Sequence, residues 1–205
     1  MSHTSGIRQA QKQKTRQALL DAALRLLEEQ SLSSLGLREV TRAVGVAPAA
    51  FYRHFRDTAD LGVALVDEAL GSLHGTIRTT LAATGDSDER IAATVELIAA
   101  LVREYPAHVR FIARERHGGV ARVREAIGAQ LDRFAQEVAD ELAQHPGSEA
   151  WERDDLLMLA GLYVDHMVMT ASAFLATPPP DWNRVARTAR RRLRLVSLGR
   201  RHWLD

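Results

Sequence analysis

The 205-residue sequence contains no cysteine, and aromatic residues make up only 5% of it. The lack of cysteine excludes disulfide bonds, thiol nucleophiles and cysteine-ligated metal sites. The longest apolar run, Leu156 to Val164, is far shorter than the roughly 20 residues that span a bilayer. The N-terminal segment MSHTSG is polar and lacks the apolar stretch of a secretory signal. We therefore expect a cytoplasmic protein with no membrane partner.

Each part of the chain is poor in charge of one sign, although the whole chain is nearly neutral. Residues 1–56 contain nine basic and four acidic residues, a net charge of +5. Residues 57–181 contain ten and 21, a net charge of −11, and residues 182–205 contain eight and one, a net charge of +7. This segregation predicts that the first segment contacts a polyanion while the acidic body stays away from it.

Hydrophobic periodicity is helical along nearly the whole chain, and no long run alternates apolar and polar residues in the manner of a strand. We predict an all-α protein of about nine helices. Residues 1–56 would form an N-terminal arm and a three-helix, helix-turn-helix domain, and residues 57–205 a second helical domain. We expect Thr15 to cap the first helix and Asp57 the fourth. Together with glycines and prolines, these caps predict helices at residues 15–29, 37–44, 48 onward, 57–81 (a linker helix), 86–105, 107–116, 120–144, 148 or 152 to 176, and 181–203.

The segment GVAPAAFYRHF, residues 45–55, concentrates aromatic and charged residues. Gly45 ends one predicted helix, and Pro48 suits the first position of the next because its missing N–H would have no intrahelical partner there. Two short helices joined by a three-residue turn form a helix-turn-helix. Phe51 and Phe55 lie four residues apart, so we expect both to pack on the first helix. The outward residues are then Ala49, Ala50, Tyr52, Arg53 and His54.

The outward residues suit contact with DNA. An arginine can donate to guanine O6 and N7, small alanines allow close approach to the bases, and tyrosine and histidine donate to phosphates. A plainer interpretation stays open, with Tyr52 at the rim of a small core and Arg53 as a solvated charge. The basic arm likewise either contacts DNA or is only a soluble helix start; its cations are Arg8, Lys12, Lys14 and Arg16.

Several segments resemble the TetR family of homodimeric transcriptional repressors: the basic arm, LREVTRAVGVAPAAFYRHF, the capped helix after it and the all-helical remainder. More narrowly, QKQKTRQALLDAA, SLGLREV, APAAFYRHFRD and FIARERHGG are similar to the FabR and DesT type, which represses unsaturated fatty-acid synthesis and desaturation. The resemblance implies operator DNA as partner and control by an effector that shifts the linker helix.

By the same resemblance, Thr41, Tyr52 and His54 hold phosphates, residues 47–50 and Arg53 face bases, and the arm follows the backbone or the minor groove. Most family members have Ser or Thr where Ala47 stands, so a side-chain cap is missing here. Most also have Lys where Thr58 stands, so a phosphate contact is missing; Arg56 could supply the positive charge of that lysine. The expected DNA-binding residues are Lys12, Lys14, Arg16, Arg38, Thr41, Ala47, Pro48, Ala49, Ala50, Tyr52, Arg53 and His54.

The predicted helix ending at residue 176 is apolar on two sides, so both sides must be covered. One side can face the core of its own domain and the other a second copy, with Gly161 and Ser172 allowing close approach. A symmetric dimer also suits a helix-turn-helix protein that contacts two half-sites. The expected dimer-interface residues are Leu157, Gly161, Val164, Val168, Leu175, Val185 and Leu193.

Apolar stripes in the second domain are either plain core or the lining of a cavity. The resemblance implies a small-molecule effector and, for the fatty-acid subgroup, a long-chain acyl-CoA whose chain saturation sets the response; no other cofactor is expected. Arg114, Arg116 and the arginines of 190–194 could bind its phosphates, or form a solvated face or salt bridges. The expected ligand-binding residues are Ile98, Val102, Phe111, Ile112, Arg114, Leu131, Phe134, Tyr163, His166 and Met167.

Other functions find less support. Asp165 and His166 beside Tyr163 are the best catalytic candidates, but adjacent helical side chains point about 100° apart. No HExxH pair is present, and the histidines at 108, 117 and 145 lack metal-ligand spacing. We therefore expect no enzyme and no metal. A nucleoid-type DNA binder stays open, as does a TetR-type repressor of an efflux or detoxification gene that responds to a hydrophobic drug-like ligand.

Overall fold

The computed structural model describes residues 2–71, 73, 79, 87–144, 148–200 and 203. Within these residues the protein is all-helical, as predicted, with nine α-helices and one short 3-10 helix. The elements are α1 (Ser2–Leu26), α2 (Leu37–Val44), α3 (Pro48–Phe51), α4 (Thr58–Gly71), α6 (Ser87–Glu104), α7 (Pro106–Glu115), α8 (Ala121–Ala143), α9 (Arg153–Leu175), η1 (Pro179–Asp181) and α10 (Trp182–Arg200).

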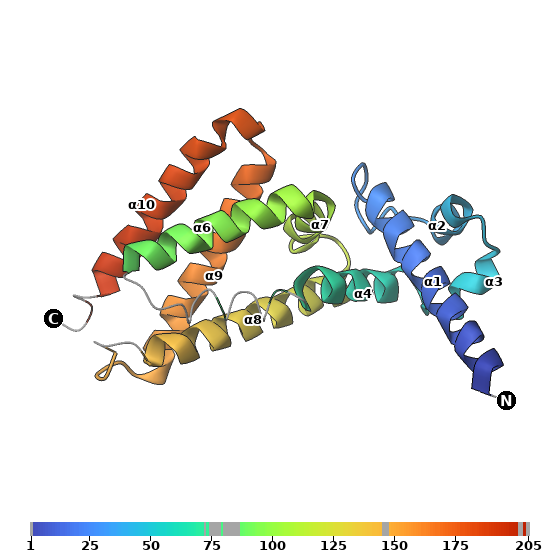
Figure 1. Ribbon diagram of the computed structural model, residues 1–205, viewed down its shortest axis with the longest axis horizontal. Coiled ribbons are helices and arrows are strands. Elements are labelled where there is room, and N and C mark those ends of the chain that lie inside the picture. The colour runs from blue at the N-terminus through green and yellow to red at the C-terminus, as the bar shows by residue number, and fades with distance from the viewer. Residues whose placement is uncertain are drawn as a thin grey trace.

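The helices form two groups, joined by α4 (Figure 1). α1, α2 and α3 make up one end of the molecule, with the N-terminus, and α6, α9 and α10 lie toward the other, with the C-terminus. α8 runs from α4 toward that far end, and α9 packs against α6, α7, α8 and α10. A signal that passes from the far group to α1–α3 must therefore cross α4, α7 or α8.

Local signals in the sequence set the ends of the helices around the helix-turn-helix. α2 ends at Gly45, whose φ of 73° lies in the left-handed region that glycine adopts without strain. α3 begins at Pro48, as predicted, although Ala47 supplies no side-chain cap. Asp57 caps α4 as predicted, because its Oδ1 accepts a 2.6 Å hydrogen bond from the Asp60 backbone N–H.

The first helix differs from the prediction. α1 extends from Ser2 to Leu26, so it begins well before Thr15 and ends before Glu29. Thr15 is not its N-cap; the Thr15 hydroxyl lies inside the helix and donates to the Gln11 carbonyl at 3.0 Å. The apolar stripe begins only at Leu19, where the helix reaches the core, so hydrophobic periodicity gives no signal for the exposed first turns.

The later helices lie within a few residues of their predicted bounds. α6, α7, α8, α9 and α10 match the predicted segments 86–105, 107–116, 120–144, 152–176 and 181–203. The linker helix predicted for 57–81 is described as α4 up to Gly71. Most of its remainder lies outside the described residues, so the predicted end at residue 81 stays a prediction.

Two apolar clusters form the interior. The larger joins the helix-turn-helix end to the second group of helices, since it contains Leu19, Phe51, Leu61, Phe111 and Ile127 in one connected set. The smaller is formed by α6, α9 and α10. The helix-turn-helix end is therefore held by α7, which contacts α1, as well as by α4.

Candidate nucleic-acid interface and ligand pocket

Two phenylalanines fix the orientation of the segment that follows α2. Phe51 is fully buried and Phe55 is 3% exposed, with their ring centroids 5.4 Å apart. The Arg16 guanidinium of α1 lies 5.1 Å from the centroid of the Phe55 ring. Both phenylalanines belong to the cluster that includes Leu19 and Leu20 of α1. This is the packing that their spacing predicted.

The opposite side of the same segment faces solvent. Tyr52 is 62% exposed and meets Phe51 only edge to face, and Arg53 is exposed beside it. Ala50 and His54 are half-buried, so they are less outward than predicted. The remaining exposed members of the predicted DNA-binding set are Lys12, Lys14, Arg16, Arg38, Ala47, Pro48 and Ala49.

Thr41 does not lie where the resemblance implies. The residue is 2% exposed, and its hydroxyl donates to the Arg38 carbonyl at 3.2 Å. A buried hydroxyl that is already bonded to its own helix has no path to a phosphate in this structure. Its apolar surroundings reflect its position on the α2 face that contains Val40, which is fully buried.

A cationic groove lies between α1 and the end of the helix-turn-helix. Its lining is Arg8, Gln9, Lys12, Gln13, Arg16 and His54. Burial, followed by the charges of Lys12, Arg16 and Arg53, lowers the pKa of His54. The buried Nδ1 of His54 has no hydrogen-bond partner in the part of the chain that the structure describes. Several cations and a histidine that face one groove, with no acidic residue in its lining, suit a phosphate group.

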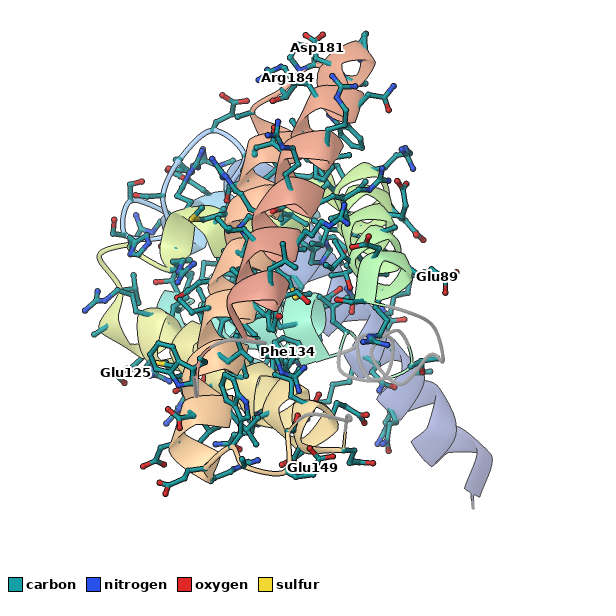
Figure 2. All side chains as sticks on the ribbon, turned by 90° about the vertical axis from the view of Figure 1, so that its left-hand side faces the viewer. Glu89, Glu125, Phe134, Glu149, Asp181 and Arg184 are labelled. Atoms are coloured by element: carbon teal, nitrogen blue, oxygen red, sulfur yellow. The ribbon has the colours of Figure 1, made fainter. Side chains whose placement is uncertain are left out.

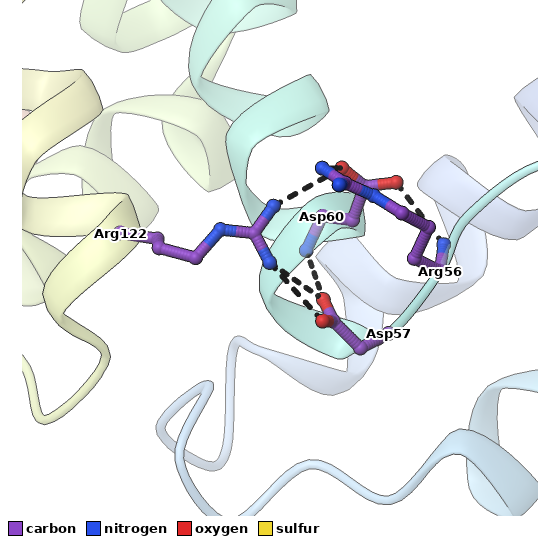
Figure 3. Close-up of polar contacts among 4 residues, drawn as sticks. All are labelled: Arg56, Asp57, Asp60 and Arg122. Carbon is purple, nitrogen blue, oxygen red and sulfur yellow. Dashed lines mark hydrogen bonds and ion pairs between the residues drawn. The ribbon is translucent and has the colours of Figure 1, made fainter.

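Polar contacts also fasten the start of α4, as Figure 3 shows. The Arg56 guanidinium donates to Asp60 Oδ1 at 3.1 Å, and its backbone N–H donates to Asp60 Oδ2. Arg122 of α8 donates to both carboxylate oxygens of Asp57, at 3.2 and 3.1 Å, and to Asp60 at 3.3 Å. Arg56 could supply the charge of the lysine that most family members have at position 58, but here its guanidinium is paired with Asp60.

At the far end of the molecule, α6, α8, α9 and α10 enclose a pocket of about 90 Å³. Five apolar side chains form part of its wall, and Ser87 and Ser197 hydrogen-bond to each other at 2.7 Å beside it. Its lining is Ser87, Arg90, Ile91, Thr94, Val138, Glu141, Leu142, Tyr163, Met167, Leu193, Ser197 and Arg200.

Two arginines of this pocket, Arg90 and Arg200, carry like charges close to each other. Burial, and to a smaller extent the charge of Arg90, lowers the pKa of Arg200. The Arg200 guanidinium donates to the Leu142 carbonyl at 3.4 Å and to the Ser148 hydroxyl, and it lies 5.9 Å from the Trp151 ring. A partly apolar pocket whose lining carries two arginines and one glutamate has a net positive charge, which favours an amphiphile with an anionic head.

Residues 19–65 match the family model described as bacterial regulatory proteins, tetR family. This range contains α2, α3 and all of the outward segment described above. The chain carries a TetR-family N-terminal DNA-binding domain. The match ends within α4, so it does not extend to the helices around the pocket.

Solved structures with the same all-helical architecture cover most of the chain. The fatty acid degradation regulator FadR from Bacillus halodurans aligns with a TM-score of 0.71 at 15% identity, over 87% of this chain and 93% of that one. FadR from Bacillus subtilis, solved with stearoyl-CoA, aligns with a TM-score of 0.66 at 15% identity, over 84% and 96%. NalD, the secondary repressor of the MexAB-OprM multidrug efflux pump in Pseudomonas aeruginosa, aligns with a TM-score of 0.65 at 18% identity, over 89% of this chain and 96% of that one. At these identities the likeness shows the TetR-type fold.

The TetR-type fold brings only two of the predicted ligand-binding residues, Tyr163 and Met167, to the pocket. Leu131 lies in a surface hollow between α8 and α9, and His166 is half-buried, with Nε2 3.4 Å from the Thr170 hydroxyl. The other apolar residues fill the two clusters, and Figure 2 shows Phe134 among the helices. These core residues are Ile98, Val102, Phe111, Ile112 and Phe134.

Arg114 has a different role from the predicted one. Its guanidinium donates to three carbonyls of the turn that follows α1, so it is not placed to bind the phosphates of a thioester in the pocket. Arg116 pairs with Asp165 at 2.8 Å. Two of the C-terminal arginines pair with α6, Arg190 with Glu96 and Arg194 with Asp88. The alternative of salt bridges to the acidic body therefore holds for these two.

The predicted dimer face is partly wrong. Val164, Val185 and Leu193 are each less than 9% exposed and belong to the interior of one chain. Leu157, Val168 and Leu175 are half-buried, whereas a Cβ added at Gly161 would meet no atom within 4 Å. The large apolar side chains that α9 and α10 expose are Met158, Leu162, Met169, Leu195 and Leu198.

In the part of the chain that the structure describes, the best catalytic candidates do not come together. Asp165 is held by Arg116, whereas His166 lies against α10, so the two side chains do not converge. Among the described residues, no group of three His, Asp or Glu side chains could hold a metal ion. By length and composition alone, α9 is apolar enough to cross a membrane; here it packs against α6, α7, α8 and α10.

Proposed function

We propose that this protein is a homodimeric TetR-type transcriptional repressor whose affinity for operator DNA is controlled by a long-chain acyl-CoA. The observation that carries the proposal is the helix-turn-helix surface, where Tyr52 and Arg53 face solvent next to the cationic groove. The pocket that would hold the effector is lined by residues of α6, α8, α9 and α10, and Figure 1 shows that α6, α9 and α10 lie toward the end opposite α1–α3. Such a separation of two sites suits allosteric control.

In the DNA complex, α3 would enter the major groove with Arg53 directed at a guanine. Tyr52 would donate to a phosphate. Lys12 and Arg16 of α1, together with His54, would hold a second phosphate in the cationic groove. The acidic body, with a net charge of −11 over residues 57–181, would be repelled by the duplex and keep the chain in one orientation.

The exposed apolar side chains of α9 and α10 would form the dimer interface. Met158, Leu162 and Met169 repeat at helical spacing on one face of α9, and Leu195 and Leu198 lie on α10. Apolar side chains of this size on two adjacent helices are typical of a protein–protein contact. A symmetric dimer would then present two helix-turn-helix surfaces to two half-sites about one helical turn of DNA apart.

For the effector, Arg90 and Arg200 would bind an anionic head, and the apolar wall would hold the start of an acyl chain. The pocket of about 90 Å³ is smaller than the roughly 300–1,000 Å³ of pockets that hold drug-sized ligands. A long chain must therefore displace side chains or separate helices, and flexible Met167 is suited to this. That displacement would couple the ligand to the position of α4 and to DNA affinity. We further propose that the target genes direct fatty-acid desaturation or unsaturated fatty-acid synthesis.

A second candidate is a repressor of an efflux gene that responds to a drug-like ligand. It is favoured by Glu141, an acidic residue in the pocket lining that suits a cationic compound. The likeness in fold to NalD is compatible with it. The two arginines of the same pocket favour the anionic amphiphile.

The test measures fluorescence anisotropy of an operator that the wild-type protein has enriched from random double-stranded DNA. Palmitoyl-CoA, oleoyl-CoA and a cationic dye are titrated separately into the complex. Shifts of opposite sign with the two thioesters, reduced in Arg200→Gln, are the expected result. Release by the dye alone would favour the efflux repressor, and tight binding that no compound alters would remove both effectors while keeping the regulator.

A further inference from the structure

The end of α7 and the start of α8 lie against the helix-turn-helix end of the molecule (Figure 1). This corner contains most of the segment FIARERHGG, residues 111–119, whose charged residues do not line the pocket between α6 and α10. Phe111 and Ile112 are core residues. The polar residues that follow them therefore need an explanation other than ligand binding.

Arg114 binds the turn of residues 27–30, which directly follows α1. Its Nη1 donates to the Leu27 carbonyl at 2.8 Å and to the Gln30 carbonyl at 2.7 Å, and its Nη2 donates to the Glu28 carbonyl at 3.3 Å. Carbonyls of an irregular turn are not paired by a regular helix or sheet ladder and take their partners from side chains or water. One guanidinium thus satisfies three carbonyls of the turn that follows α1, from a different part of the chain.

Glu115 fixes the loop that follows α1. The residue is 1% exposed, and its Oε1 accepts a 2.9 Å hydrogen bond from the Leu32 backbone N–H. Gly118 leaves room for this carboxylate, because a Cβ at Gly118 would lie 2.2 Å from Glu115 Oε2. Burying a carboxylate is costly unless it makes specific contacts. We attribute the buried Glu115 carboxylate to the position that it imposes on Leu32 rather than to a gain in folding stability.

Close packing makes this corner stiff. Leu32 of the loop and Val123 of α8 both pack against Gly62 of α4, since a Cβ added at Gly62 would be 2.5 Å from Leu32 Cδ2 and 2.8 Å from Val123 Cγ2. Val123 is fully buried. Packed cores tend to move between discrete arrangements rather than deform smoothly. A displacement of α7 or α8 must therefore carry the loop, and with it α1, to a new position.

We propose that Arg114 and Glu115 are positioning residues that set the angle of the helix-turn-helix relative to the dimerising body, and thereby the half-site spacing that the dimer accepts. This inference rests on the proposed function. It concerns two side chains that touch neither DNA nor effector, and it assigns a purpose to the ARER part of the segment. Arg114 holds the turn that follows α1, Glu115 holds Leu32 just beyond that turn, and together they transmit the position of α7 to α1.

The experiment uses the operator enriched by the wild-type protein and a series of variants of that operator with one or two base pairs added to or removed from its spacer. Anisotropy gives the affinity of each protein for each spacing and for a single half-site. The proteins are wild type, Arg114→Gln, Arg114→Lys and Glu115→Gln. The matched control is Arg110→Gln, which removes an exposed arginine of α7 that crosses the same boundary to Glu28 at 3.3 Å.

For the wild type and Arg110→Gln we expect a sharp spacing optimum. In Arg114→Gln and Glu115→Gln the preference for the optimal spacing over its neighbours should fall by about fivefold or more, the lower end of typical coupling between sites, with unchanged affinity for the half-site. Arg114→Lys should restore the preference only in part, because an ammonium cannot reach all three carbonyls.

Thermal melts separate this effect from misfolding. If Glu115→Gln does not fold, Arg114→Gln and Arg114→Lys still test the inference. Arg114 is exposed, so its replacement leaves the apolar packing in place. A folded Arg114→Gln with the wild-type spacing profile would overturn the inference and leave the DNA-binding function standing. Failure of the wild-type protein to enrich any sequence would overturn both.

Discussion

The two ends of the molecule have opposite surfaces. At the helix-turn-helix end, phenylalanines are buried and cations face an open groove with no acidic residue in its lining. On α9 and α10, methionine and leucine side chains are exposed, while arginines such as Arg190 and Arg194 pair with acidic residues of α6. The first surface is complementary to a polyanion and the second to another apolar surface. One chain thus carries two distinct contact surfaces.

The largest expected effect tests the buried side of the helix-turn-helix. Phe51→Ala should destabilise this end by about 3–5 kcal/mol, because it leaves a cavity at a fully buried site. Denaturant unfolding measures the loss. Tyr52→Ala, at the exposed neighbour, should cost far less stability; equal losses would contradict the assignment of the two faces.

The next effect concerns the apolar surface of α9. Leu162→Glu places a charge at a 53% exposed residue that we assign to the dimer contact, and it should weaken dimerisation by at least about 2 kcal/mol, the scale of a central interface residue. Equilibrium sedimentation at micromolar concentration measures the shift. Asp154→Ala, at an exposed residue of the first turn of α9, is the control. A Leu162→Glu protein that stays dimeric would place the interface elsewhere.

Substitution on the DNA-contacting face should change the free energy of specific DNA binding by as much as Leu162→Glu changes that of dimerisation, or by less. Arg53→Ala should cost about 1–3 kcal/mol with the enriched operator and relax the base preference, as expected for loss of a bidentate contact to guanine. Its unfolding free energy should change little because Arg53 is exposed. Equal loss of affinity for operator and scrambled DNA would make Arg53 a phosphate contact instead.

The smallest effect is a pH dependence from His54. Its pKa is lowered from the ordinary 6.5, so most of the rings are neutral at pH 7. The ring gains its charge as the pH falls toward and below this lowered pKa. A phosphate favours the charged form, so DNA affinity should rise between pH 7.5 and 5.5, by about 0.2–1 kcal/mol, the scale of a solvent-facing ion pair. His54→Gln should flatten this part of the profile in anisotropy titrations, and an unchanged slope would assign the proton to another group.

The sequence predicted the features that depend on local signals. Gly45, Pro48 and Asp57 mark helix ends through backbone conformation and capping, which neighbouring residues decide. The burial of Phe51 and Phe55 also followed from their spacing. The early start of α1 was missed because its first turns touch no core, so no apolar stripe records them.

Features that depend on distant contacts could not be predicted. Periodicity shows that Ile98 and Phe134 lie on apolar stripes, but only the fold shows that neighbours fill the space beside them. Arg114 was assigned to a ligand, although its partners are carbonyls more than 80 residues away. Besides the two apolar sides that the sequence indicated, α9 exposes Met158 and Leu162, and their exposure could not be distinguished from burial by sequence alone.

The most direct test of the account is enrichment of random double-stranded DNA by the purified protein, followed by affinity measurements at a fixed salt concentration. We expect an inverted repeat with half-sites about one helical turn apart, bound about 10³-fold or more tightly than scrambled DNA. Binding that is indifferent to sequence would contradict a regulator and indicate a nucleoid-type protein, and no binding at all would contradict the assignment of the helix-turn-helix surface.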